Sequence, residues 1–102
     1  MTYKLTLRDR LVLIDIMPTQ GSLLDMIMVR SIRNTIDPTP QDIEKYNIRQ
    51  SDNGLVWDNS RDVGEDFHLS ESEVMFIQQQ FAYWDHNNQF KLDWLDTYNL
   101  FK

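Results

Sequence analysis

Histidine is a common metal ligand and general base, and this sequence contains two histidines. His68 and His86 are the only histidines, and the chain has no cysteine. A zinc site needs several ligands at suitable spacings, and none accompanies His86. His86 ends a predicted helix, where the helix dipole favours a protonated imidazole. We therefore interpret His86 as a surface residue rather than a metal ligand or general base.

The segment that begins at Asp85 has the approximate spacing of a calcium-binding loop. Counted from Asp85, oxygen-bearing side chains fall at the first, third, fifth, ninth and twelfth positions. The sixth position, which needs glycine for a sharp turn, is Phe90, and the twelfth, normally a bidentate glutamate, is Asp96. We interpret this segment as a polar connection between two helices, without calcium.

Nucleotide-binding and hydrolase motifs are absent. The three glycines, Gly21, Gly54 and Gly64, form no phosphate-binding loop, and there is no Gly-x-Ser-x-Gly motif. The sequence therefore predicts a protein that is not an enzyme and that uses no cofactor and no metal.

The length of the chain predicts a single domain, residues 1–102. Apolar runs such as Leu11–Ile14 are far shorter than the roughly 20 residues of a membrane span. The first ten residues include Lys4, Arg8 and Arg10, which is too charged for a signal peptide. The absence of cysteine fits a reducing compartment. We expect a soluble, cytoplasmic protein with no membrane partner.

Three helices are predicted in the first half from their start and stop residues. Thr6 caps a first helix that ends before Pro18, and Ser22 caps a second that ends at Asp37-Pro38. Thr39 caps a short third helix, Pro40–Tyr46, which has proline at its first position. Apolar residues recur at helical spacing in the first two.

Two more helices are predicted near the end of the chain. Ser70 and Glu73 form a capping box at the start of the fourth, which ends at Asn87-Asn88. The fifth is predicted over about Gln89–Leu100. Both carry aromatic stripes, which in a small domain are expected to fill the core.

Between the third and fourth helices the sequence predicts a β-hairpin. Asn53-Gly54 is typical of a type I′ turn, and centring the turn there pairs Arg49 with Asp58. Ile48, Leu55 and Trp57 then share one face, which we expect to pack against the helices. Glu65–Leu69 is predicted as a third strand, and Tyr3–Leu5 could form another.

The predicted fold class is therefore α+β: a mostly helical single domain with a small antiparallel sheet. The order of elements is three helices, a hairpin, a strand and two helices, which resembles a winged helix. A DNA-binding regulator is one alternative function, with Arg8, Arg10, Arg30 and Arg33 as its phosphate contacts. The third helix has one lysine and two acids, and the net charge of −6 opposes nucleic acid, so we expect none to bind.

Charge and aromatic residues are distributed unevenly along the chain. Residues 51–102 hold ten of the sixteen carboxylates, ten of the twelve aromatics and only three basic residues, a net charge of about −7. Such a surface suits a basic protein partner. The residues predicted to steer that partner are Glu71, Asp85, Asp93 and Asp96, and those predicted to anchor it are Tyr83 and Trp94. Two alternatives remain: the acidic surface only aids solubility, or the chain is a homo-oligomeric structural subunit.

The first third of the chain resembles small uncharacterised proteins of tailed phages and prophages. The resemblance is carried by the opening Lys4–Leu13, the proline-containing break with Gly21, and Val29–Arg33. It implies a phage-type origin. With that origin, we expect an accessory protein or inhibitor that acts in the host cytoplasm on a basic host or phage protein, or alternatively a homo-oligomeric phage structural component. The resemblance implies no catalytic residues.

Overall fold

Four of the five helices begin at a side chain that caps them. The structure is a computed structural model that describes residues 1–102. Thr6 Oγ1 accepts a hydrogen bond from the Asp9 amide at 3.1 Å, and the Asp9 carboxylate accepts one from the Thr6 amide at 3.0 Å. This capping box starts α1 (Leu7–Ile16), and equivalent boxes start α3 (Pro40–Tyr46) and α4 (Glu71–His86). Ser22 caps α2 (Leu23–Ile36), so all four predicted caps are confirmed.

The last helix begins later than the sequence pattern predicts. The chain from Gln89 to Lys91 is not helical, a 3₁₀ turn follows at Leu92–Trp94, and α5 covers Leu95–Phe101. Asn88 has a positive φ of 56°, which ends the preceding helical path. No side chain caps α5, so its start lacks the local sequence feature that marks the others.

The strands form two separate antiparallel pairs. Strand β1 (Thr2–Leu5) pairs with β4 (Glu65–His68), and Tyr3 lies opposite Phe67. Strand β2 (Arg49–Ser51) pairs only with β3 (Gly54–Val56). The α+β class is confirmed, and the order of helices, hairpin and last strand agrees with the sequence pattern. The prediction of one sheet built on the hairpin is wrong, because β4 pairs with the N-terminal strand instead.

The hairpin also differs from its prediction in register and in burial. Ser51 lies opposite Gly54, so the turn residues are Asp52 and Asn53, and of the Asn53-Gly54 pair only Gly54 has positive φ, 105°. This corresponds to a turn followed by glycine rather than to a type I′ turn on Asn53-Gly54. Leu55 is 47% exposed, and Ile48 and Trp57 are half-buried outside the core, so the prediction of a core face here is wrong. The predicted Arg49–Asp58 ion pair does form, at 3.6 Å.

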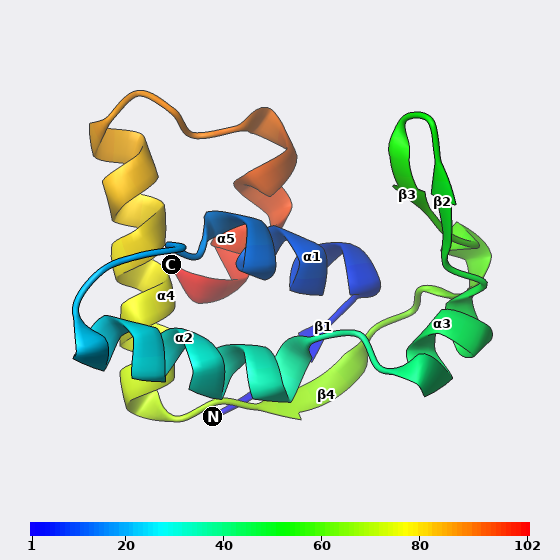
Figure 1. The fold of residues 1–102 in the computed structure, drawn as a ribbon, viewed down its shortest axis with the longest axis horizontal. Coiled ribbons are helices and arrows are strands. Elements are labelled where there is room, and N and C mark those ends of the chain that lie inside the picture. Colours follow the sequence, from blue (N-terminus) through cyan, green and yellow to red (C-terminus); the bar gives the residue numbers. More distant parts are fainter.

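The helices pack around α4. Helices α1, α2 and α5 each contact it, and α1 also contacts α5 and β1. In Figure 1 the hairpin β2–β3 projects above α3, at the right-hand edge of the molecule. The core is formed by apolar side chains from β1, α1, α2, α4 and the C-terminal segment: Leu5, Val12, Leu13, Ile16, Met17, Ile32, Ile36, Leu69, Val74, Phe76, Ile77, Phe81, Trp94 and Phe101.

Buried Arg10 connects α1 to the next two helices, α2 and α3. Its Nε donates to the Ile36 carbonyl at 2.9 Å, and its Nη2 contacts the Asp42 carboxylate at 2.8 Å. The guanidinium lies 4.8 Å from the centre of the Phe67 ring. Because Arg10 is only 2% exposed, its charge is satisfied entirely by these contacts and by the Asp37 carbonyl.

Asp62 joins the base of the hairpin to the start of α1. Its Oδ1 accepts from the Leu7 amide at 2.6 Å, and its Oδ2 accepts from the Trp57 indole Nε1 at 3.3 Å. A carboxylate at a helix N-terminus is stabilised by the helix dipole and the free amides there. The hairpin is thus attached at its base while its tip stays exposed.

Candidate functional site

An apolar hollow of about 460 Å³ lies between α4 and α5. Its lining comes from Phe81 and Ala82 of α4, Phe90 of the connection, and Leu95, Tyr98 and Phe101 of α5. The two helices approach each other because Phe81 and Phe101 are both buried in the core. Ala82 and Leu95 are exposed, so the outer part of the hollow is open to solvent.

The aromatic side chains of the α4–α5 hollow pack edge to face. The Phe81 and Tyr98 ring centres are 5.5 Å apart at an interplanar angle of 80°, and Phe90 and Tyr98 are 5.5 Å apart at 89°. Such pairs contribute about 0.5–1.5 kcal/mol each beyond their buried area. The wall of the hollow is therefore formed by aromatic rings that pack against one another.

Two hydrogen bonds fix α5 in place. Gln78 Nε2 donates to the Phe101 carbonyl at 2.6 Å, across the lower edge of the α4–α5 hollow. On the other side of α5, buried Thr97 donates from Oγ1 to Asp9 Oδ1 at 2.6 Å. The hollow is consequently preformed, and a ligand would not need to order it first.

The rim of the α4–α5 hollow is polar. Gln78, Asp85 and Lys102 complete its lining, with Asp85 and Lys102 as the charged groups. Asp96 is exposed on α5 next to Leu95, but its side chain is not part of the lining. An apolar floor with a few charged groups at the edge is the usual composition of a docking surface for a protein side chain.

The titratable groups with shifted pKa values lie away from this hollow. Burial raises the pKa of Asp42, but hydrogen bonds from Arg10 and Thr39 outweigh it and hold that pKa below its usual value. Burial also raises the pKa of Glu73, but hydrogen bonds from Ser70 and Ser31 outweigh this effect and lower it below its usual value. Both carboxylates stabilise helix starts, so their shifts have a structural cause.

The third shifted cluster connects α3 to β4. A hydrogen bond from Lys45 lowers the pKa of Glu65, and the same contact raises the pKa of Lys45. Burial, and then the hydrogen bond that it donates to Glu65, raise the pKa of Tyr46. No buried side-chain nitrogen or oxygen lacks a hydrogen-bond partner.

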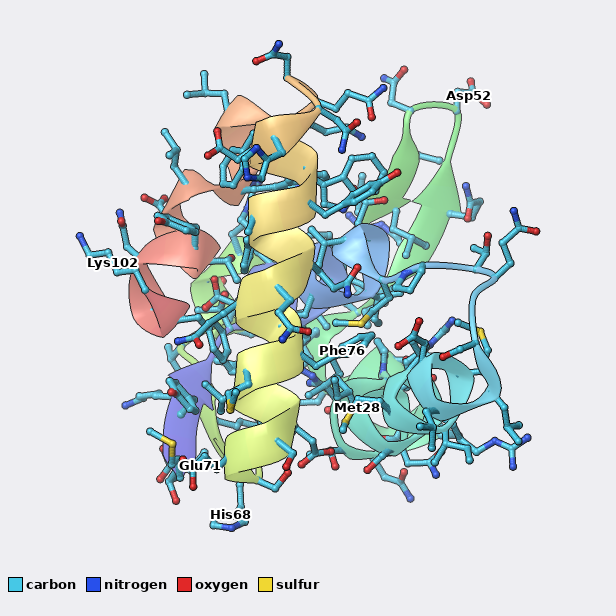
Figure 2. All side chains as sticks on the ribbon, turned by 90° about the vertical axis from the view of Figure 1, so that its left-hand side faces the viewer. Met28, Asp52, His68, Glu71, Phe76 and Lys102 are labelled. Carbon is cyan, nitrogen blue, oxygen red and sulfur yellow. The ribbon has the colours of Figure 1, made fainter.

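The acidic residues predicted to steer a partner do not form one patch. Asp85 lines the α4–α5 hollow, whereas Asp93 lines a groove of about 390 Å³ between α1 and the hairpin, together with Arg8 and Lys91. Glu71 is exposed at the opposite end of α4, at the lower end of the helix in Figure 2.

Of the two predicted aromatic anchors, only Tyr83 is accessible. Tyr83 is 56% exposed and lies beside the connection from α1 to α2. Trp94 is only 3% exposed and packs against Trp84 and Phe90 at 5.6 Å, so its assignment as an exposed anchor is wrong. The helical spacing of Trp94 with Phe90, Tyr98 and Phe101 is equally compatible with a core position and with an interface position. In the structure Trp94 is part of the core.

The basic residues of the DNA-binding alternative are also dispersed. Arg10 is buried in its ion pair with Asp42, so its assignment as a phosphate contact is wrong. Arg33 pairs with Asp37 at 3.1 Å, and Arg8 lies on α1 while Arg30 lies on α2. None of the four residues lies on α3, the helix that would read bases in a winged helix.

The sequence pattern did not single out Ala82 or Leu95 as site residues. Alanine and leucine are common in any amphipathic helix, so neither residue stands out in the sequence. The open space between Ala82 and Leu95 follows from where α5 begins and how it packs against α4. Their exposure next to buried aromatics could be found only from the packing of α5 against α4.

Two further properties bear on ligands. No group of three or more histidine, aspartate or glutamate side chains is arranged to hold a metal ion. None of the helices combines the length and the apolar character that a membrane-spanning helix needs.

Comparison of the chain with protein families, with curated proteins and with solved structures found no match in any of the three.

Proposed function

We propose that this chain is a non-enzymatic protein-binding domain whose α4–α5 hollow accepts apolar side chains of a basic protein partner. The observation that carries the proposal is the preformed aromatic hollow of about 460 Å³ in the acidic second half of the chain. Leu95, which lines the hollow, is 44% exposed, and the same C-terminal segment exposes two further leucines, Leu92 (80%) and Leu100 (42%). Large side chains that enter such a hollow supply most of the energy of an interface.

Electrostatics favours a basic partner. The second half of the chain carries about −7, and its field attracts cationic surfaces and accelerates encounter. Asp85 at the rim would then lie opposite a partner lysine or arginine. The resemblance of the first third of the chain to tailed-phage proteins adds the proposal that the chain is phage-encoded and that the partner is a host or phage protein.

A synthetic amphipathic peptide with leucines on one helical face and lysines on the other tests this proposal. Fluorescence anisotropy of the labelled peptide gives its affinity at physiological ionic strength. Ala82→Lys puts a long cation into the hollow and is expected to weaken binding at least about tenfold, a loss of about 1.4 kcal/mol. Asp85→Asn is expected to weaken it about two- to threefold and to reduce its salt dependence.

Matched variants separate the α4–α5 hollow from general effects of charge and exposed apolar area. Met75→Lys makes the same kind of change at a 52% exposed position of α4 that does not line the hollow, and it should bind normally. Asp52→Asn makes the same charge change as Asp85→Asn at the hairpin tip (Figure 2) and should also bind normally. The proposal fails if Ala82→Lys binds as tightly as Met75→Lys, or if a peptide with glutamates in place of the lysines binds equally well.

A further inference from the structure

The first two turns of α2 expose large apolar side chains that nothing in the chain covers. Leu23 and Leu24 are each 77% exposed, and Ile27, one turn later, is 56% exposed. They lie on one side of α2, while Ile32 and Ile36 on the other side are fully buried in the core. Aliphatic side chains that cluster at this exposure on consecutive turns indicate an interaction surface rather than scattered exposed residues.

The same side of α2 becomes basic further along the helix. Arg30 is exposed one turn after Ile27 and forms no ion pair, whereas Arg33 is already paired with Asp37. The exposed side of α2 therefore presents an apolar half followed by a free cation. This matches the lining of the α4–α5 hollow, which is mostly apolar and has Asp85 at its rim, with Lys102 as the other charged group there.

The two complementary surfaces lie on different sides of one molecule. In Figure 2, Met28 of α2 and Lys102 at the end of α5 lie on opposite sides of α4. Helix α2 therefore cannot reach the hollow of its own chain, but it can reach the hollow of another copy. A contact between two different surfaces of identical chains is heterologous and propagates head to tail until it closes into a ring or extends as a filament.

We infer that a second copy of this chain is the partner of the hollow, with Leu24 and Ile27 of its α2 inserted between α4 and α5 and its Arg30 facing Asp85. This inference rests on the proposed function of the hollow. Residues 1–50, which include α2, carry a net charge of about +1 and residues 51–102 about −7, so the α2 side of one copy is complementary in charge to the acidic half of another, and this complementarity selects the occupant.

Light scattering and sedimentation of the full-length chain at increasing concentration test the inference. The wild-type mass is expected to rise above the 12.2 kDa of one chain, and to pass twice that value at high concentration. The Leu24→Glu/Ile27→Glu double variant keeps an intact hollow and should remain monomeric. The Ala82→Lys variant keeps an intact α2 and should also remain monomeric.

Mixing the two variants gives the decisive result. Each supplies the surface that the other lacks, so the mixture should form a one-to-one complex of twice the monomer mass and grow no further. Recovery of binding in the mixture also shows that both variants are folded. Met75→Lys should associate like the wild type, and Arg30→Gln should weaken association about three- to tenfold.

Three results would overturn the inference. If the wild-type chain stays monomeric at all concentrations, the self-association inference is wrong. Peptide binding to the hollow then still tests the proposed function separately. Association of Ala82→Lys alone would assign the contact to a symmetric α2–α2 pair. Association of the Leu24→Glu/Ile27→Glu variant alone would assign it to a surface other than α2.

Discussion

Arg10 has the largest structural role of any single charged residue in the chain. Its guanidinium contacts the end of α2, the start of α3 and the Phe67 ring of β4. Its sequence neighbours place it on a helix but give no indication of burial, because its hydrogen-bond partners lie 26 to 32 residues away and Phe67 lies further still. Sequence patterns describe the element that carries a residue, whereas such distant partners are defined only by the packed chain.

Replacing Arg10 tests this role. Arg10→Met keeps most of the side-chain volume but leaves the Asp42 carboxylate without its cation, so unfolding free energy should fall by about 3–5 kcal/mol. Arg8→Met on the same helix removes an exposed arginine and should change it by no more than about 0.5 kcal/mol. Urea denaturation of both variants measures the difference; equal effects would contradict the assigned role of Arg10.

The lowered pKa of Asp42 predicts a loss of stability in acid. Because the folded pKa lies below the ordinary value of 3.8, the folded state binds fewer protons than the unfolded chain as pH falls through this range. The contribution is fully present well above pH 3.8 and is lost as pH falls through the lower, folded pKa. Glu65 and Glu73 act in the same direction from their ordinary value of 4.5.

Urea midpoints measured between neutral pH and about pH 3 test this prediction. The wild-type midpoint should fall through the acidic range. Asp42→Asn should be less stable at neutral pH and should show a shallower fall in acid. A variant whose acid dependence matches that of the wild type would show that Asp42 does not contribute to it.

At the scale of the elements, the helix starts were the most predictable features of the chain. Thr6, Ser22, Thr39 and Ser70 all act within three residues of themselves, so their sequence neighbours contain all the necessary information. Strand pairing was less predictable. Strand β4 pairs with β1 across 60 or more residues, and Leu55 of the hairpin faces a groove toward α1 that leaves it 47% exposed.

The capping box of α4 can be tested by single substitutions. Ser70→Ala removes the oxygen that accepts from the Glu73 amide at 3.1 Å and should destabilise the protein by about 1 kcal/mol. Ser72→Ala, two residues later and exposed, removes a hydroxyl without a cap contact and should be close to neutral. Thermal denaturation followed by circular dichroism compares them, and a Ser70→Ala protein as stable as Ser72→Ala would mean that α4 begins elsewhere.

At the scale of the whole molecule, the separation of charge and apolar surface governs what the protein can bind. The uneven composition of the two halves was visible in the sequence, and so was the aromatic content of the last two helices. Their outcome was not: Trp94 enters the core, Asp93 and Asp85 line different hollows, and exposed Leu95 opens one of them. The spacing of residues within one helix does not show how much of that helix a short neighbouring helix will cover. The covered area decides which aromatic side chains remain accessible.

Isotope-edited NMR of the protein during titration with the leucine–lysine peptide tests the α4–α5 hollow most directly. The Leu24→Glu/Ile27→Glu variant is the suitable sample, because a second copy cannot then compete for the hollow. The amide resonances of Ala82, Leu95 and Tyr98 should shift most, with those of the hairpin and of α2 unchanged. A map centred on the hairpin or on α2, or saturable binding that leaves those three resonances unmoved, would contradict the assignment of the hollow as the binding site.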